Sequence, residues 1–178
     1  GTMQVIIKDN LNPGAAATVY GRVTCEGRPL ADVVISDGVE VVKTDASGVY
    51  QMTSQKKFGY VFVSIPSGYE VLSDGVLPLL HQRLISDADT GERVDFNLVK
   101  SDWDQNSYTL LTFGDMHLAG GRNNDRIYFS QFCNDVNDYI ESRKAEKVLA
   151  LTLGDMTWDY YWYDRNYQFK EYLADVNK

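Results

Sequence analysis

The sequence of 178 residues has no long hydrophobic run and few basic side chains. No stretch approaches the 18 or more consecutive apolar residues of a membrane-spanning helix, so no transmembrane segment is expected. Lysine and arginine number 17 against 25 acidic residues, which gives a net charge of −8. Because nucleic acids are bound through clustered Lys and Arg, this balance argues against a nucleic-acid partner. It is compatible with the binding of divalent cations.

Cysteine and histidine are also rare, with two of each. Cys25 and Cys133 lie far apart in regions of different pattern, so we expect two small apolar residues rather than a disulfide. The opening residues GTMQVII have neither the basic segment nor the apolar core of a signal peptide. The initial glycine is expected to be a cloning remnant, which leaves open a targeting segment upstream.

Residues 1–100 carry the pattern of an all-β domain. VYGRVTC alternates between apolar and polar residues, and the runs DVVIS and VEVVKT flank Asp37-Gly38, a strong hairpin signal. Further strands are expected at 59–66 and 93–99, between turns rich in Gly, Asp and Ser. Short strands at this spacing predict an antiparallel sandwich or barrel. Only LPLLHQRLI, residues 77–85, is ambiguous.

Residues 101–107 are polar and predict a linker, after which the pattern changes. The apolar runs at 108–113 and 147–153 are typical of strands buried on both faces. Between them, apolar residues recur every three or four positions, which predicts a helix capped at Asn123 or Asn124. We therefore expect 108–178 to begin an α/β domain with a βαβ unit whose strands are parallel.

Two similar sequences, LLTFGDMHLAG (110–120) and LALTLGDMTWD (149–159), end the two predicted strands. Ligands of open α/β sheets bind beyond the carboxyl ends of strands, and neighbouring strands lie only ~4.8 Å apart. Asp115 and Asp155 are therefore expected to approach each other, and two close carboxylates need a shared proton or a cation. His117 favours the cation.

Each motif alone is better explained as a turn at a strand end. In matched positions, however, Asp115, His117 and Asp155 form a mixed oxygen and nitrogen ligand set suited to Zn, Mn or Fe. The sequence thus predicts a metal site at this edge of the sheet.

GDMH followed by LGDMTWD resembles the first two motifs of the calcineurin-like metallophosphoesterases. The resemblance implies the beginning of a four-layer α/β catalytic domain, with Asp115 and His117 on one metal and Asp155 bridging two. It implies two divalent or trivalent ions of the Zn, Mn, Fe or Mg class and hydrolysis of phosphate mono- or diesters by a metal-activated hydroxide. The family places two residues between the aspartates of its second motif, whereas three precede Asp159. Asp159 is therefore expected at most to contact a ligand.

The first half resembles a domain that precedes the catalytic domain in a bacterial, often exported, subgroup of these enzymes. The residues that carry this resemblance are GRVTCEGRPLADVVISDGVEVVKTDASGVYQM and GYVFVSIPSGY. The resemblance implies a sandwich of transthyretin or carboxypeptidase-regulatory type. It also implies a periplasmic or cell-surface location and, as substrate, a small phosphate ester or a component of the cell envelope.

The later histidine-containing motifs of the family are absent, and His81 is expected to be a packing or surface residue. We therefore expect a fragment with an incomplete catalytic domain, weak or no metal binding, and little or no activity. A partner chain would supply the missing part of the sheet, or the piece would be partly rearranged.

Several residues near the motifs have two readings. Arg122 lies in a loop that either approaches phosphate or simply enters the helix. Trp158 and Tyr160 either form an aromatic rim for the substrate or pack on the sheet. Two rival functions also stay open. One is a non-catalytic extracellular β-sandwich binding module with a degenerate α/β scaffold, and the other is a phosphoaspartyl enzyme with Asp115 as nucleophile.

Overall fold

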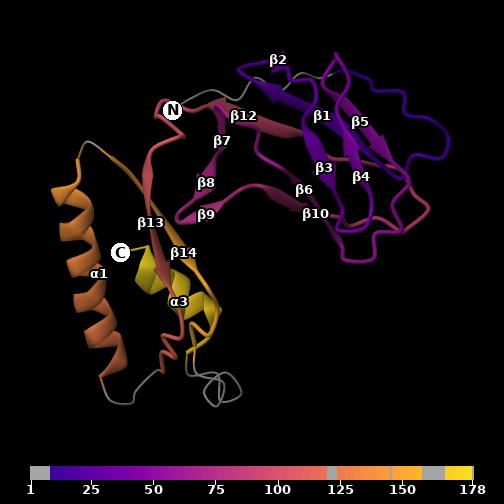
Figure 1. The fold of residues 1–178 in the computed structure, drawn as a ribbon. Helices are drawn as coiled ribbons and strands as arrows, with labels where there is room; N and C mark the ends of the chain where they lie inside the picture. Colours follow the sequence, from indigo (N-terminus) through magenta and orange to yellow (C-terminus); the bar gives the residue numbers. More distant parts are fainter. Residues whose placement is uncertain (1–8, 120–123, 145, 158–166, 178) are drawn as a thin grey trace. The chain divides into compact units, whose positions relative to one another are not determined.

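The computed structural model describes residues 9–119, 124–144, 146–157 and 167–177. The chain divides into two compact units, Gly1–Asp102 and Trp103–Lys178. In Figure 1 the first runs from indigo through magenta to salmon, and the second from salmon through orange to yellow. Within the described ranges, no helix combines the length and the apolar character that crossing a membrane requires.

The first unit consists of β-strands arranged in two larger sheets and one small hairpin. The first sheet has the order β11 (Glu92–Arg93), β1 (Val19–Cys25), β12 (Phe96–Lys100), β7 (Tyr69–Val71), and β1 also pairs with β2 (Arg28–Pro29) and β5 (Val49–Met52). The second sheet has the order β10 (His81–Arg83), β6 (Tyr60–Val63), β3 (Val34–Ser36), β4 (Val41–Lys43). The hairpin joins β8 (Ser73–Asp74) and β9 (Leu77–Pro78).

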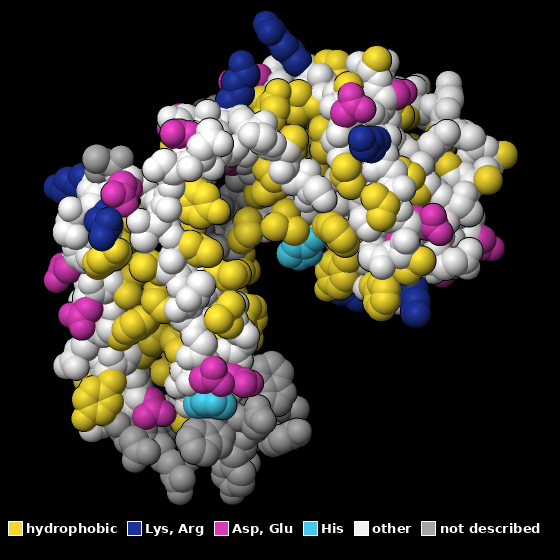
Figure 2. Space-filling view, in the orientation of Figure 1, with side chains coloured by type: hydrophobic (Ala, Val, Ile, Leu, Met, Phe, Trp, Pro, Cys, Tyr) yellow, Lys and Arg dark blue, Asp and Glu magenta, His cyan; other side chains and the backbone are white. Residues whose placement is uncertain are grey.

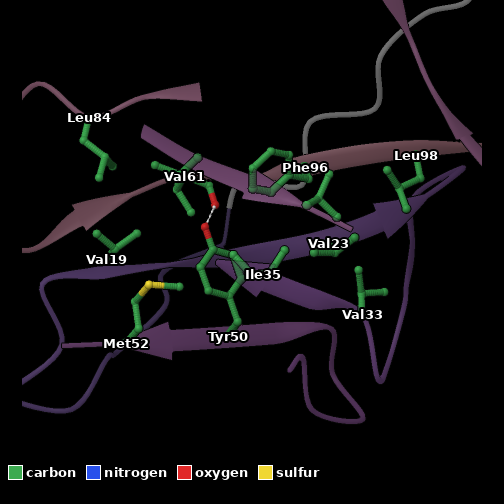
Figure 3. Close-up of a cluster of buried hydrophobic side chains, with 12 residues drawn as sticks. Val19, Val23, Val33, Ile35, Tyr50, Met52, Val61, Leu84, Phe96 and Leu98 are labelled. Carbon is green, nitrogen blue, oxygen red and sulfur yellow. Dashed lines mark hydrogen bonds between the residues drawn. The ribbon is translucent and has the colours of Figure 1, made fainter. Parts of the chain in front are cut away.

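Both sheets contribute to one hydrophobic core. In β1 every second residue is buried, as the period of a strand with one inward face requires. Val23 of β1 and Phe96 of β12 share the core with Ile35 of β3 and Val61 of β6, from the other sheet (Figure 3). The prediction of an N-terminal all-β sandwich is therefore confirmed.

The strand directions differ from the antiparallel expectation in one respect. The first strand, β1, pairs in parallel with both β11 and β12 near the end of the unit. Parallel neighbours need a long connection, and here all the intervening strands of the unit supply it. The ambiguous stretch 77–85 forms extended structure, with β9 in the hairpin and β10 at the edge of the second sheet.

A close backbone approach explains one glycine of β1. The buried Tyr50 hydroxyl donates a 2.6 Å hydrogen bond to the Val94 carbonyl oxygen. A Cβ on Gly21 would lie 1.8 Å from that same oxygen, so only glycine fits there. Burial raises the pKa of Tyr50 well above its usual range, which keeps the hydroxyl protonated as a donor.

The second unit contains the predicted strand, helix and strand. They are β13 (Tyr108–Phe113), α1 (Asp125–Ser142) and β14 (Lys147–Thr152), and a short helix α3 (Phe169–Val176) follows. β13 and β14 pair in parallel, so the prediction of a parallel pair is confirmed. Asn124 is the N-cap of α1 but its side chain makes no capping hydrogen bond. Asn123, the other predicted cap, lies outside the described residues.

One face of the β13–β14 pair is partly covered by α1 and the other is largely exposed. Phe113 meets Phe132 of α1 edge to face, with ring centroids 5.2 Å apart. On the opposite face, four large side chains are 47–65% exposed, namely Tyr108, Leu110, Leu151 and Leu153. The prediction of strands buried on both faces is therefore wrong for the described residues. A continuous apolar run allows a strand to be buried on both faces. The elements that pack against each face must come from elsewhere in the fold.

Candidate metal centre

The pairing of the two strands continues into the segments that follow them. Phe113 pairs with Thr152, and beyond the strand ends Leu118 forms a parallel bridge with Thr157. Partners are thus 39 residues apart at both places. The two aspartates of the repeated motif are 40 residues apart. The motifs are therefore offset from each other by one residue.

This offset places Asp155 between the two candidate ligands of the other strand. In the common register, Asp155 is level with Met116, which separates Asp115 from His117 in the sequence. The backbone N–H of His117 donates to the Asp155 carbonyl oxygen at 2.8 Å. One carboxylate from the end of β14 can therefore approach both a carboxylate and an imidazole from the end of β13.

The side chains of Asp115, His117 and Asp155 do converge. Each offers a ligand atom, and these atoms lie within 4.8 Å of one another. His117 Nε2 lies 3.7 Å from Asp115 Oδ1, and all three residues are exposed. Figure 2 shows acidic side chains beside a histidine on the surface of the second unit. The structure thus brings together all three predicted metal ligands.

The donor set and its spacing fit a divalent cation. His nitrogen and carboxylate oxygen bind zinc at about 2.0–2.2 Å, so two ligands of one ion lie at most about 4.4 Å apart. The observed limit of 4.8 Å is close to that value. Because the side chains are exposed, small rotations suffice to close the difference. Two carboxylates and one imidazole suit Zn, Mn or Fe.

All three candidate ligands have a left-handed backbone. Their φ angles are +56° at Asp115, +46° at His117 and +49° at Asp155. This conformation costs a residue with a Cβ roughly 1–2 kcal/mol, although Asp tolerates it better than most. Such strain persists only where the surrounding structure enforces it, and it gathers at functional sites. Three cases in one small cluster therefore support a functional assignment.

The methionine of each motif turns away from the ligands. Met116 and Met156 are half-buried and pack against a cluster formed by Leu118, Phe129, Tyr167 and Tyr172. Sequence reasoning assigned no role to either methionine. The sequence did contain a signal for them, because the methionine is repeated in both motifs together with the glycine and the aspartate.

Four other residues were predicted to lie near the metal site. Arg122, Trp158, Asp159 and Tyr160 lie outside the described residues. His81 is exposed on β10 in the first unit, where its ring meets Tyr60 edge to face with centroids 5.6 Å apart. It behaves as a surface packing residue.

Comparison with known families identifies the first unit. Residues 17–101 match the family described as N terminal of calcineurin-like phosphoesterase. The resemblance of the first half to the domain that precedes the catalytic domain of calcineurin-like phosphoesterases is therefore confirmed, and the match ends before the candidate metal ligands. A search of curated proteins found no significant match.

Proposed function

We propose that the protein serves in metal-dependent hydrolysis of phosphate esters, and that Asp115, His117 and Asp155 are metal ligands. The observation that carries the proposal is the convergence of these three side chains at the ends of two parallel strands. The phosphoesterase-associated domain at 17–101 supports it independently, because that match rests on different residues.

In metal-dependent hydrolysis of a phosphate ester, the three ligands would have different roles. Bound divalent ions acidify a water molecule and neutralise charge on the phosphoryl group during in-line attack. Asp115 and His117 would hold one ion. Asp155, which is level with the residue between them, would help to hold a second. All three side chains are exposed, so a substrate could reach ions held by them.

The wider assignments follow from the same proposal. The substrate would be a small phosphate ester or a component of the cell envelope, and the protein would act in the periplasm or at the cell surface. The three side chains that the described residues bring together are too few for two fully coordinated ions. Residues 1–178 alone are therefore expected to bind metal weakly and to turn over little or no phosphodiester.

Metal titration tests the assignment directly. Wild-type protein is expected to bind Co²⁺ or Mn²⁺, and Asp155→Asn should weaken the affinity at least about tenfold because a charged ligand is lost. Isothermal titration calorimetry and the visible spectrum of Co²⁺ measure this. Asp138→Asn, on the exposed surface of α1, is the matched control and should bind like wild type.

Two outcomes would contradict the proposal. One is equal affinity in the wild-type and Asp155→Asn proteins. The other is the absence of any binding at millimolar metal, which would instead favour a non-catalytic β-sandwich module carrying a degenerate scaffold.

A further inference from the structure

We propose that Met116 and Met156 are positioning residues that hold the three metal ligands in their left-handed backbone conformation. This inference rests on the proposed metal site, and it concerns two residues that carry no ligand atom for it.

The first step is the placement of the methionines among the ligands. Met116 separates Asp115 from His117, and Met156 directly follows Asp155. In the register of the parallel pair, Met116 is level with Asp155 and Met156 is level with His117. Each ligand therefore has a methionine beside it in the sequence, and two of them have one across the pair as well.

The second step is the opposite environments of ligands and methionines. The ligand side chains are exposed, with Asp115 79% and His117 46% accessible. Both methionines pack against the buried cluster that contains Leu118, Phe129 and Tyr172. The chain thus alternates between solvent and core over four residues, from Asp115 to Leu118.

The third step is the backbone conformation that this alternation requires. Asp115, His117 and Asp155 all have positive φ, an unfavourable state for residues with a Cβ. Backbone hydrogen bonds from the neighbouring strand fix part of this segment, at 2.8 Å from the His117 N–H to the Asp155 carbonyl oxygen and at 3.0 Å from the Leu118 N–H to the Met156 carbonyl oxygen. Buried side chains between the strained residues supply the remaining constraint. Methionine suits this task because its unbranched thioether fills irregular space.

The first experiment compares Met116→Ala and Met156→Ala with Leu173→Ala in the full chain. Leu173 of α3 packs on the same cluster but is remote in sequence from the ligands, so it controls for lost packing. The two methionine variants are expected to lose at least about tenfold in Co²⁺ affinity, as when outer groups that orient ligands are removed. Leu173→Ala should lose stability in urea but keep its affinity.

Replacing each methionine by leucine tests whether a side chain of similar size restores the metal affinity. Leucine has nearly the volume of methionine and remains apolar, so Met116→Leu and Met156→Leu should restore wild-type affinity. Unchanged affinity in the alanine variants, or an equal loss in Leu173→Ala, would overturn the inference.

A second readout needs no metal and separates this inference from the proposed function. NMR backbone couplings and chemical shifts report φ at Asp115, His117 and Asp155. In the metal-free alanine variants these φ angles should leave the left-handed region, while Met→Leu variants keep them. Retention of positive φ in both alanine variants would refute the positioning role. If wild type binds no Co²⁺, the proposed function fails, and the φ values still decide whether the methionines set the backbone.

Discussion

Gly154 precedes the second candidate aspartate and has a φ of +107°. A Cβ at this position would meet nothing within 4 Å, so alanine would fit sterically but would strain the backbone. Gly114 precedes the first aspartate, and a Cβ there would make only an ordinary 3.8 Å contact with Leu153. The two glycines of the repeated motif therefore have different reasons for being present.

We predict that Gly154→Ala destabilises the second unit by about 1–2 kcal/mol, the cost of placing a Cβ in a left-handed conformation. Gly114→Ala should be neutral or slightly stabilising. Urea unfolding followed by tryptophan fluorescence measures both. Equal effects of the two substitutions would show that backbone strain does not distinguish them.

Glu92 shows how a single carboxylate makes stability depend on pH. Burial alone would raise the pKa of Glu92, but hydrogen bonds from the Ser86 hydroxyl and from the N–H groups of Ile85 and Ser86 outweigh it. With the Lys56 ammonium 3.5 Å away, they lower the pKa of Glu92 from its ordinary 4.5 to about 2. The ionised form is therefore the one that the fold stabilises.

The pH window follows from the direction of this shift. The stabilisation is complete above pH 4.5 and is lost as the pH falls toward 2. It amounts to on the order of 3 kcal/mol, from the 1.36 kcal/mol that each pKa unit represents. We predict that Glu92→Gln is less stable than wild type at pH 7 and that the difference shrinks between pH 4.5 and 2.

Thermal unfolding across this range measures the effect, and Glu40→Gln, at an exposed position, is the control. A constant difference between wild type and Glu92→Gln from pH 7 to pH 2 would contradict the assignment.

At the scale of elements, α1 and α3 are joined by an ion pair. Arg126 of α1 donates two hydrogen bonds to the Asp175 carboxylate of α3, at 2.6 and 2.8 Å. The buried Tyr167 hydroxyl donates a third at 2.9 Å. Asp175 is 8% exposed at its side chain whereas Arg126 is 48% exposed. The two partners of the pair are therefore unequally desolvated.

We predict an asymmetry between the two ends of this pair. Arg126→Met should cost about 3 kcal/mol, because it leaves a nearly buried carboxylate without its cation. Asp175→Asn should cost less, about 1–2 kcal/mol, because the Arg126 guanidinium can be hydrated and the amide oxygen still accepts from Tyr167. Hydrogen exchange of α3 amides and urea unfolding measure the two losses. The opposite order would contradict this account.

The elements themselves were largely predictable. The apolar runs at 108–113 and 147–153 and the helical periodicity between them identified β13, β14 and α1, because the local pattern reports the period of an element. The sequence pattern of an element does not show which other elements pack against its faces. The exposed face with Leu110 and Leu151 was for this reason predicted wrongly as buried.

At the scale of the whole molecule, the two units differ in the size of their cores. Twelve buried side chains form the core of the first unit (Figure 3), whereas the described part of the second has a cluster of four. Apolar burial is the main source of stability, so the second unit is expected to unfold first.

The positions of tryptophan allow this to be measured. All three tryptophans, Trp103, Trp158 and Trp162, belong to the second unit, so their fluorescence reports on that unit alone. In urea we predict a fluorescence transition at lower concentration than the loss of β-sheet circular dichroism. Coincident transitions by both probes would indicate a single cooperative structure.

The sequence by itself determined the all-β first half, the parallel strand pair and the identity of three candidate metal ligands. These follow from alternation, apolar runs and a motif that occurs twice, all of which are local. The tertiary structure alone decided the 39-residue register, which places Asp155 between the levels of Asp115 and His117. It also decided that Met116 and Met156 turn toward the core, because side-chain direction beyond a strand end depends on backbone angles that neighbouring elements impose.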